Sequence, residues 1–214
     1  MKSNVTIIDY GLGNLFSIKR AFEHCNVDAK ITQSHDDIGK ADRLVLPGVG
    51  AFSAGIIGLK ELHLIEPIKE YALTGRPFLG ICLGMQMMME ASEEFGKHRG
   101  LGIIRGTVVP VPSKGAGSEK LKIPHVGWNS LCKPGYVDSW DKTILQGISL
   151  GTYMYFVHSY YVEPSDKNNC VAFADYGGHR LPAVIAMGYI YGCQFHPERS
   201  AAKGLHILEN FMKI

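Results

Sequence analysis

The sequence predicts a single α/β domain over residues 1–214, built on a mostly parallel open sheet with helices on both faces and an antiparallel extension. In the N-terminal half, short apolar runs alternate with segments whose apolar residues recur at helical spacing, which is typical of such a sheet. After Leu101 the apolar runs are separated by Pro, Gly and Ser, as expected for antiparallel strands. The hydrophobic content of 46% is enough to bury one substantial core.

The N-terminal half supplies strands and helices in turn. A buried strand over 5–8 leads into a glycine-rich turn that ends at Asn14, a residue type suited to cap a helix. The further elements that we expect are strands over 29–32 and 43–46, a helix over 54–73 that stops at Gly75, a strand over 77–81 and a helix over 85–91.

The C-terminal half reads mainly as short strands. The β-like runs are 107–111, 120–123, 152–157, 170–174, 183–187 and 190–195. Between the two halves, residues 93–100 are polar and bounded by glycine, which predicts an exposed loop, and residues 112–122 look like a flexible loop. Ser200 is expected to cap a final amphipathic helix that carries Leu205, Leu208 and Phe211.

Composition excludes several classes of function. A net charge of +2 gives no electrostatic reason to expect nucleic acid or an anionic membrane as partner. No apolar run approaches the roughly 18 residues of a membrane span, and Met1 to Asn4 lead directly into a strand, so we expect a cytosolic protein. Five cysteines without a C-x-x-C pair argue against disulfides and zinc, and we expect no metal or cofactor. The turn at Gly11 and Gly13 lacks the third glycine of a dinucleotide fingerprint.

A cysteine lies where the strand over 77–81 turns into a helix. The order is Gly80-Ile81-Cys82-Leu83-Gly84, and glycines on both sides permit the sharp turn of a nucleophile elbow. At such a corner, free N–H groups and the helix dipole favour the thiolate, and the Leu83 amide points to where an oxyanion would form. The alternative is a small buried hydrophobe, the usual role of a free cysteine.

A second chemical stretch follows the strand over 190–195. In His196-Pro197-Glu198 the proline biases His196 toward extended backbone, so that Glu198, two residues on, can lie beside the imidazole. A carboxylate on one ring nitrogen fixes the tautomer while the other nitrogen takes a thiol proton. No other histidine has a carboxylate two residues on, although His158 is a further candidate for the site.

The strand over 43–46 ends in Pro47-Gly48-Val49-Gly50-Ala51-Phe52. Two glycines at the carboxyl end of a parallel strand allow the backbone to turn amide hydrogens toward a ligand, so this loop could supply a second oxyanion donor. An ordinary strand-to-helix turn is the alternative.

These stretches resemble the glutaminase domain of class I glutamine amidotransferases, which have a flavodoxin-like fold and release ammonia from glutamine through a thioester. The resemblance rests on residues 80–86 with 195–198, and it extends to the glutaminase subunits of imidazole glycerol phosphate synthase through residues 9–15, 46–52, 123–129 and 155–160. It implies Cys82 as nucleophile, His196 as general base and acid, and Glu198 as its orienter.

The resemblance also implies binding roles. Val49, Gly50 and Leu83 would form the oxyanion hole. The residues implied to hold L-glutamine are Gln86, Glu94, His158, Ser159 and Tyr160. Those implied to contact a partner are Asn14, His125, Trp128 and Arg199. The family usually has lysine where this chain has Arg199, a change that puts detailed contacts at the interface in doubt.

The implied partner is a (β/α)₈ barrel cyclase that forms a heterodimer with the glutaminase and makes imidazole glycerol phosphate and an aminoimidazole carboxamide ribotide in histidine biosynthesis. Ammonia made in water is protonated and lost, and the sequence has no phosphate loop or metal constellation with which to use it. Three alternatives stay open: a paralogous glutaminase that feeds another synthase, a stand-alone peptidase or γ-glutamyl hydrolase, and a non-catalytic binding module.

Overall fold

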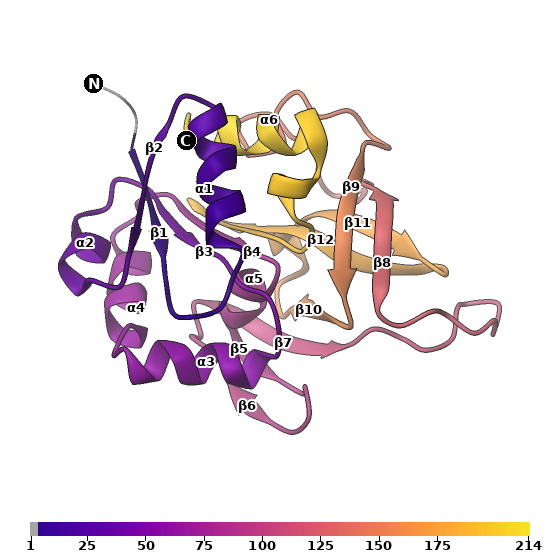
Figure 1. Cartoon of the computed structure of the whole chain (residues 1–214). Coiled ribbons are helices and arrows are strands. Elements are labelled where there is room, and N and C mark those ends of the chain that lie inside the picture. The colour runs from indigo at the N-terminus through magenta and orange to yellow at the C-terminus, as the bar shows by residue number, and fades with distance from the viewer. Residues whose placement is uncertain (1–3) are drawn as a thin grey trace.

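The central sheet has seven strands in the order β11-β12-β13-β4-β3-β1-β2 (Figure 1). In this computed structural model, which describes residues 4–214, five of these strands are parallel: β1 (Asn4–Ile8), β2 (Asp28–Thr32), β3 (Leu44–Leu46), β4 (Phe78–Ile81) and β13 (Ile190–Cys193). The antiparallel strands β11 (Cys170–Tyr176) and β12 (His179–Met187) extend the sheet beyond β13. The predicted fold class is confirmed, while the expectation for Met1 to Ser3 lies outside the described residues.

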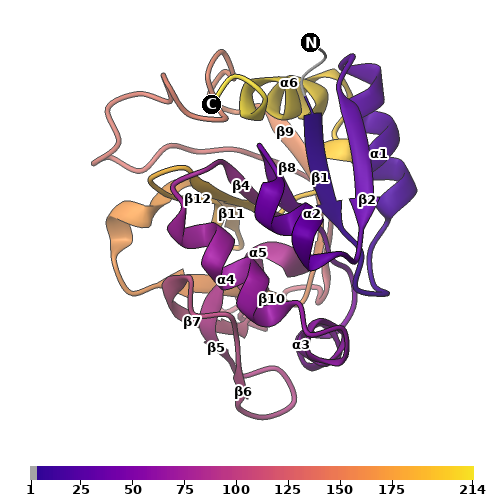
Figure 2. The same ribbon diagram turned by 90° about the vertical axis from the view of Figure 1, so that its left-hand side faces the viewer.

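Helices cover both faces of the sheet. On one face, α1 (Leu15–His24) and α6 (Ala201–Phe211) bury Phe22 and Phe211 in one apolar cluster. On the other, α2 (His35–Lys40), α3 (Phe52–Glu61), α4 (Ile65–Leu73) and α5 (Leu83–Met87) bury Leu59 and Met85 in a second. Figures 1 and 2 show α1 and α6 toward the top of the molecule, with α3 and α4 below them.

Two smaller sheets adjoin the central one. β10 (Tyr160–Pro164), β7 (Ile104–Pro110), β5 (Met89–Ser92) and β6 (His98–Arg99) form one, and the antiparallel pair β8 (His125–Ser130) and β9 (Tyr153–His158) forms the other. Short 3₁₀ helices, η1 (Lys167–Asn169) and η2 (Pro197–Arg199), complete the secondary structure of the described part. β9 and β10 are separated by Ser159 alone, so one continuous stretch links the two small sheets.

The structure corrects the predicted helix over 85–91. The helix after Cys82 ends at Met87, and the chain continues as β5. Backbone N–H groups of Leu101, Ile103 and Gly102 donate to the carbonyl oxygens of Met87, Met88 and Met89, respectively. A longer helix would need those carbonyl groups for its own hydrogen bonds, so tertiary pairing overrides the helical preference of the methionines.

Other expectations were also wrong in detail. The helix predicted over 54–73 is two helices, α3 and α4, separated by residues 62–64, where His63 has a φ of 55°. Residues 120–123 form no strand, since Lys120 makes only an isolated bridge with Lys114. Asn14 and Ser200 occupy N-cap positions, but neither side chain makes a capping hydrogen bond. β8, β10 and the short β6 were not predicted, and β6 lies inside the loop expected at 93–100.

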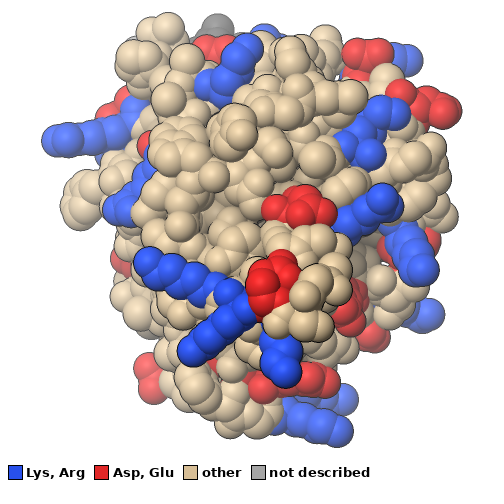
Figure 3. Space-filling model, turned by 90° about the vertical axis from the view of Figure 1, so that its right-hand side faces the viewer, with Lys and Arg blue, Asp and Glu red and all other residues tan. Residues whose placement is uncertain are grey.

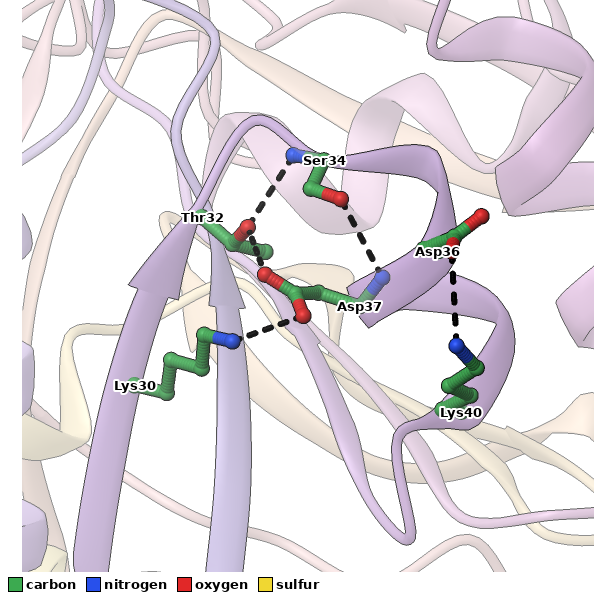
Figure 4. A network of polar contacts seen from close by, with 6 residues as sticks. All are labelled: Lys30, Thr32, Ser34, Asp36, Asp37 and Lys40. Atoms are coloured by element: carbon green, nitrogen blue, oxygen red, sulfur yellow. Dashed lines mark hydrogen bonds and ion pairs between the residues drawn. The ribbon is translucent and has the colours of Figure 1, made fainter.

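A polar network joins the edge strand β2 to α2 (Figure 4). Ser34 caps α2 by accepting a hydrogen bond from the Asp37 N–H, and the Asp37 carboxylate accepts from the Thr32 hydroxyl at 2.6 Å. Lys30 Nζ lies 2.6 Å from the same carboxylate, and its hydrogen bond holds the pKa of Asp37 below the usual range. This network is part of the scaffold and shares no residue with the cavity beside Cys82.

The surface carries both signs of charge. Figure 3 shows Lys and Arg side chains interspersed with Asp and Glu on one face of the molecule. Within residues 4–214, no helix is both long and apolar enough to cross a membrane.

Candidate active site

Cys82 lies at the corner between β4 and α5. Its φ of 53° is in the left-handed region, which non-glycine residues rarely adopt. A Cβ atom at Gly80 would lie 2.7 Å from the backbone nitrogen of Met85, and one at Gly84 would overlap the carbonyl oxygen of Leu46. The two glycines therefore permit α5 to fold back closely on β4 and β3, and the strained backbone places the thiol at the helix N-terminus.

The thiol borders a cavity of ≈ 250 Å³ at the carboxyl ends of the parallel strands. Its lining brings together segments far apart in sequence, namely Val49, Gly50, Cys82, Leu83, Gln86, Glu94, Pro124, Val157, His158, Ser159, Tyr160 and His196. Every residue that the sequence implied for the oxyanion hole and for glutamine binding is in this set. Pro124 and Val157 were not expected there.

His196 follows β13, the neighbour of β4, and its Nδ1 atom lies 2.8 Å from Oε1 of Glu198. Both side chains are buried. Burial by itself lowers the pKa of His196, but the adjacent Cys82 sulfur and Glu198 carboxylate outweigh it and raise the pKa to about 10. Nε2 of His196 is buried and makes no hydrogen bond to any of the described residues, so it is free to take up the thiol proton.

Ser200 and Tyr155 fix the backbone of this histidine. Ser200 Oγ donates to the carbonyl oxygen of His196 at 2.7 Å and accepts from the Tyr155 N–H at 3.0 Å. The His196 N–H in turn donates to the Tyr155 carbonyl oxygen at 2.9 Å. The serine predicted to cap α6 instead ties the histidine to β9.

The Pro47–Phe52 turn is held at both ends, and its middle faces the cavity. Tyr10 Oη donates to the carbonyl oxygen of Pro47 at 2.8 Å, and the Phe52 N–H donates to the Glu94 carboxylate. Burial raises the pKa of Tyr10, so its hydroxyl keeps its proton as a donor. Val49 and Gly50 are exposed between these anchors, and Gly50 has a φ of 99°.

A Cβ atom at Gly48 would overlap the Tyr10 hydroxyl and would approach the Leu83 Cβ to 2.9 Å. The turn is therefore pressed against the start of α5, whose first residue, Leu83, has an N–H group that the helix leaves free. This geometry suits an oxyanion hole made from two loops.

Of the residues implied for a partner interface, Trp128 is 52% exposed and Arg199 is exposed, while Asn14 is partly buried at the start of α1. His125 differs from the expectation. It is only 4% exposed, and its ring stacks on Tyr176 with centroids 4.1 Å apart. In the chain alone, His125 therefore offers almost no exposed surface for a partner to contact.

Besides Pro124 and Val157, sequence reasoning missed two residues that support the site. Gln194 is fully buried beside Cys82, and Tyr10 anchors the Pro47 turn. A signal for Gln194 was present, because it is a polar residue in an apolar strand segment and precedes His196 by two positions, the spacing of one strand face. Within the described residues, no three His, Cys, Asp or Glu side chains gather in a way that could hold a metal ion.

Comparison with known proteins places these features in context. A family model described as glutamine amidotransferase class-I matches residues 6–214. The imidazole glycerol phosphate synthase subunit HisH 1 of Legionella pneumophila (strain Lens) is 50% identical over 212 residues, which cover 99% of this chain and 100% of the relative. The subunit HisH of Caldanaerobacter subterraneus is 48% identical over 207 residues, 97% of this chain and 96% of the relative.

Solved structures show the same fold at low sequence identity. PurLQS from Thermotoga maritima has a TM-score of 0.73 at 19% identity, covering 100% of this chain and 99% of the other. A putative GMP synthase protein from Thermoplasma acidophilum has a TM-score of 0.70 at 19% identity, with coverage of 100% and 94%.

Proposed function

Because the chain belongs to the class-I glutamine amidotransferase family, and within it to the HisH subunits of imidazole glycerol phosphate synthase, we propose that it hydrolyses L-glutamine at Cys82 and supplies ammonia to a cyclase partner. The observation that carries the proposal is that Cys82 and His196 line one cavity while Glu198 contacts the far ring nitrogen of His196. The backbone N–H groups of Leu83 and of the turn at Val49 and Gly50 border the same cavity. The site therefore combines a nucleophile, a base and oxyanion donors, as acyl transfer from a side-chain amide requires.

In the first half of the reaction, the Cys82 thiol transfers its proton to His196 and the thiolate attacks the side-chain amide carbon of glutamine. The carbon–oxygen double bond opens, and the resulting oxyanion accepts hydrogen bonds from the Leu83 N–H and from the turn at Val49 and Gly50. His196 then returns the proton to the leaving nitrogen, which departs as ammonia and leaves a γ-glutamyl thioester on the sulfur. Glu198 stabilises the imidazolium that exists between these steps.

In the second half, His196 takes a proton from a water molecule as that water attacks the thioester carbon. The same amides hold the second oxyanion. When the carbon–sulfur bond breaks, the thiolate recovers a proton from His196 and glutamate is released. The net reaction converts glutamine and water into glutamate and ammonia.

The cyclase partner is part of the proposal. Val126 and Trp128 lie two residues apart on β8, so they share one face, and both are about half exposed. An exposed aromatic residue beside an aliphatic one suits a hydrophobic protein contact better than solvent. The five cysteines are all free thiols, which fits a reducing cytoplasm as the place of action.

Activity is expected to depend on the partner. We propose that the backbone of the Pro47–Phe52 turn changes orientation when the cyclase and its ribotide bind, which completes the oxyanion hole. Gly50 permits this at little cost because a glycine adopts positive or negative φ readily. One oxyanion donor is typically worth about 10²- to 10³-fold in rate.

The test measures glutamate release by the chain alone, with the cyclase subunit of an imidazole glycerol phosphate synthase, and with that cyclase plus its ribotide ligand. We expect low activity alone and a rise of about 10²-fold or more in the full complex. Cys82→Ala in the same complex is the blank. Full activity without any partner would favour the stand-alone hydrolase, and activation only by a different synthase would favour the paralogous glutaminase.

A further inference from the structure

Gln194 contacts the nucleophile from within the protein. Its side chain is completely buried, and its Nε2 atom lies 3.7 Å from the Cys82 sulfur, within hydrogen-bonding range for sulfur. We propose that Gln194 is a catalytic residue whose amide N–H stabilises the Cys82 thiolate, and that a chain of buried polar side chains orients this amide. The proposal rests on the function proposed above, because it concerns the same thiol.

The direction of the Gln194 amide follows from its neighbour Gln86. The carbonyl oxygen of Tyr160 can only accept, so Gln86 must present its Nε2 to it, at 2.9 Å. Gln86 Nε2 also lies 3.1 Å from Gln194 Oε1 and has a second hydrogen to donate there. With its oxygen used in this way, Gln194 turns its own N–H₂ group toward the sulfur. The acceptor nature of one backbone carbonyl thus sets two amide orientations.

The same carbonyl oxygen also fixes two histidine tautomers. His158 Nδ1 lies 2.9 Å from the Tyr160 oxygen, so Nδ1 carries the hydrogen and Nε2 is an acceptor. His125 Nδ1, 3.0 Å from that Nε2, must then be the donor. Its remaining nitrogen accepts from Asn129 Nδ2 at 3.3 Å. Every nitrogen of both rings therefore has a partner of the right kind.

Burial keeps this pair in the form that the hydrogen bonds require. It lowers the pKa of His158 to about 3 and that of His125 to about 4, so both rings are neutral at neutral pH. Asn129 is in turn fixed by donating to the Asp175 carbonyl oxygen at 2.8 Å and by accepting from the Ser130 N–H at 2.7 Å. The series of hydrogen bonds thus runs from Asn129 on β8 to the sulfur of Cys82.

The chemical role of Gln194 is confined to the thiolate. When the thiol proton moves to His196, the sulfur gains a full negative charge, and the N–H of Gln194 becomes a charge-assisted donor to it. When the carbon–sulfur bond forms, that charge moves to the oxyanion and the hydrogen bond weakens; it is restored when the thioester is hydrolysed. Gln194 gives up no proton at any step. A hydrogen bond to a charged group is commonly worth a factor of about ten or more in an equilibrium constant.

Two variants at position 194 test the contact. Gln194→Met keeps the length and the burial but removes the donor, and Gln194→Glu keeps the oxygen for Gln86 but sets an acceptor against the sulfur. The readout is the pH dependence of alkylation of Cys82 by iodoacetamide in the free chain, followed on the Cys82 peptide by mass spectrometry. We expect the pH of half-maximal alkylation to be higher than in wild type for both variants, with the larger increase in Gln194→Glu. In the cyclase complex, we expect Gln194→Met to lower kcat/KM for glutamine by about tenfold.

An unchanged alkylation profile in both variants would overturn the role of Gln194. Should Gln194→Met fail to fold, Gln194→Asn serves in its place, because it keeps an amide but withdraws the donor by one methylene. The alkylation assay uses no glutamine and no partner. Its failure is therefore distinct from failure of the proposed function, which would appear as an inactive wild-type complex.

His125 tests the orienting chain, because it acts on the sulfur only through its neighbours. In His125→Phe the ring still stacks on Tyr176 but the donor to His158 is lost, whereas in His125→Asn the side-chain amide can replace Nδ1 as donor. We expect His125→Phe to raise the pH of half-maximal alkylation and to lower kcat/KM, and His125→Asn to restore both toward wild type. Equal behaviour of the two variants would show that His125 has no positioning role beyond packing.

Discussion

Nδ1 of His196 lies 2.8 Å from Oε1 of Glu198, and the second carboxylate oxygen has no hydrogen-bond partner. The buried carboxylate therefore accepts its one side-chain hydrogen bond from the imidazole ring. We expect His196→Ala to lower kcat by about 10²- to 10⁴-fold, because proton transfer is lost. Glu198→Gln should cost less, since the amide oxygen can still accept from Nδ1. Steady-state kinetics of both variants in the cyclase complex check the ranking, and equal losses would contradict this division of roles.

Cys82→Ala should abolish glutamine hydrolysis, because Cys82 is the only cysteine in the lining of the cavity. The fold should survive, since the variant keeps the Cβ atom and loses only the sulfur at an otherwise unchanged corner. Cys25→Ala is the matched control: Cys25 is a partly buried free thiol that lies 3.8 Å from the Leu205 carbonyl oxygen and outside the cavity lining. Glutamate release and thermal unfolding of both variants give the answer. Turnover by purified Cys82→Ala would remove Cys82 as nucleophile.

Tyr10→Phe should lower kcat by about tenfold with little change in KM. The variant loses the hydroxyl that holds the Pro47 carbonyl at 2.8 Å, so the turn that carries Val49 and Gly50 is placed less accurately in the transition state. Tyr71→Phe is the control, because Tyr71 is another buried tyrosine whose hydroxyl donates to a proline carbonyl, that of Pro77, at 3.0 Å, at the opposite end of β4. A similar loss of kcat in both variants would point to general destabilisation and not to the turn.

The free energy of unfolding of the chain should decrease when the pH is lowered from 6.5 to 5.5. Burial lowers the folded-state pKa of His125 to about 4 and of His158 to about 3, whereas both titrate near 6.5 when unfolded. The unfolded chain thus binds protons in this window and the folded chain does not, so stability is present above pH 6.5 and is lost as pH falls toward 4. The raised pKa of His196 does not alter this expectation. Its stabilising contribution is already almost fully present at pH 6.5 and is lost only as the pH rises toward 10.

For the two histidines together the expected loss is about 2 kcal/mol in the free energy of unfolding over that one pH unit. Urea unfolding at pH 7.5, 6.5 and 5.5 measures it. His125→Asn should lose about half as much as wild type over the same range, since one of the two buried rings is gone. A pH dependence that is the same in wild type and variant would show that His125 is not kept neutral by the fold.

Trp128→Ala should weaken binding of the cyclase by about tenfold or more, as is common for an aromatic residue at the centre of an interface. Tyr189→Ala is the control, because Tyr189 is exposed to a similar degree, 55% against 52%, but lies in the turn between β12 and β13. Titration calorimetry of each variant with the cyclase subunit measures the affinities. Equal loss of affinity in the two variants would contradict the assignment of β8 to the partner face.

Local sequence was enough to predict the chemical centre. Gly80 and Gly84 around Cys82 permit one sharp corner, and the two-residue step from His196 to Glu198 brings a carboxylate to an imidazole through extended backbone alone. The parallel core of the sheet was equally predictable, since strands buried on both faces are apolar throughout. These features depend on residues close in sequence, whose geometry the backbone dihedral angles determine.

Only the tertiary structure decided what depends on distant partners. The helix after Cys82 ends at Met87 because residues 100–104 compete for its carbonyl groups, and no local pattern announces that competition. The family resemblance implied His125 as a partner contact, but the fold buries its ring between His158 and Tyr176. The role proposed for Gln194 depends on its contact with the sulfur of Cys82, which is 112 positions away in the sequence. Hydrogen bonds of this kind join side chains from different strands and helices. They form only when packing brings those elements together, so no single segment of the sequence can predict them.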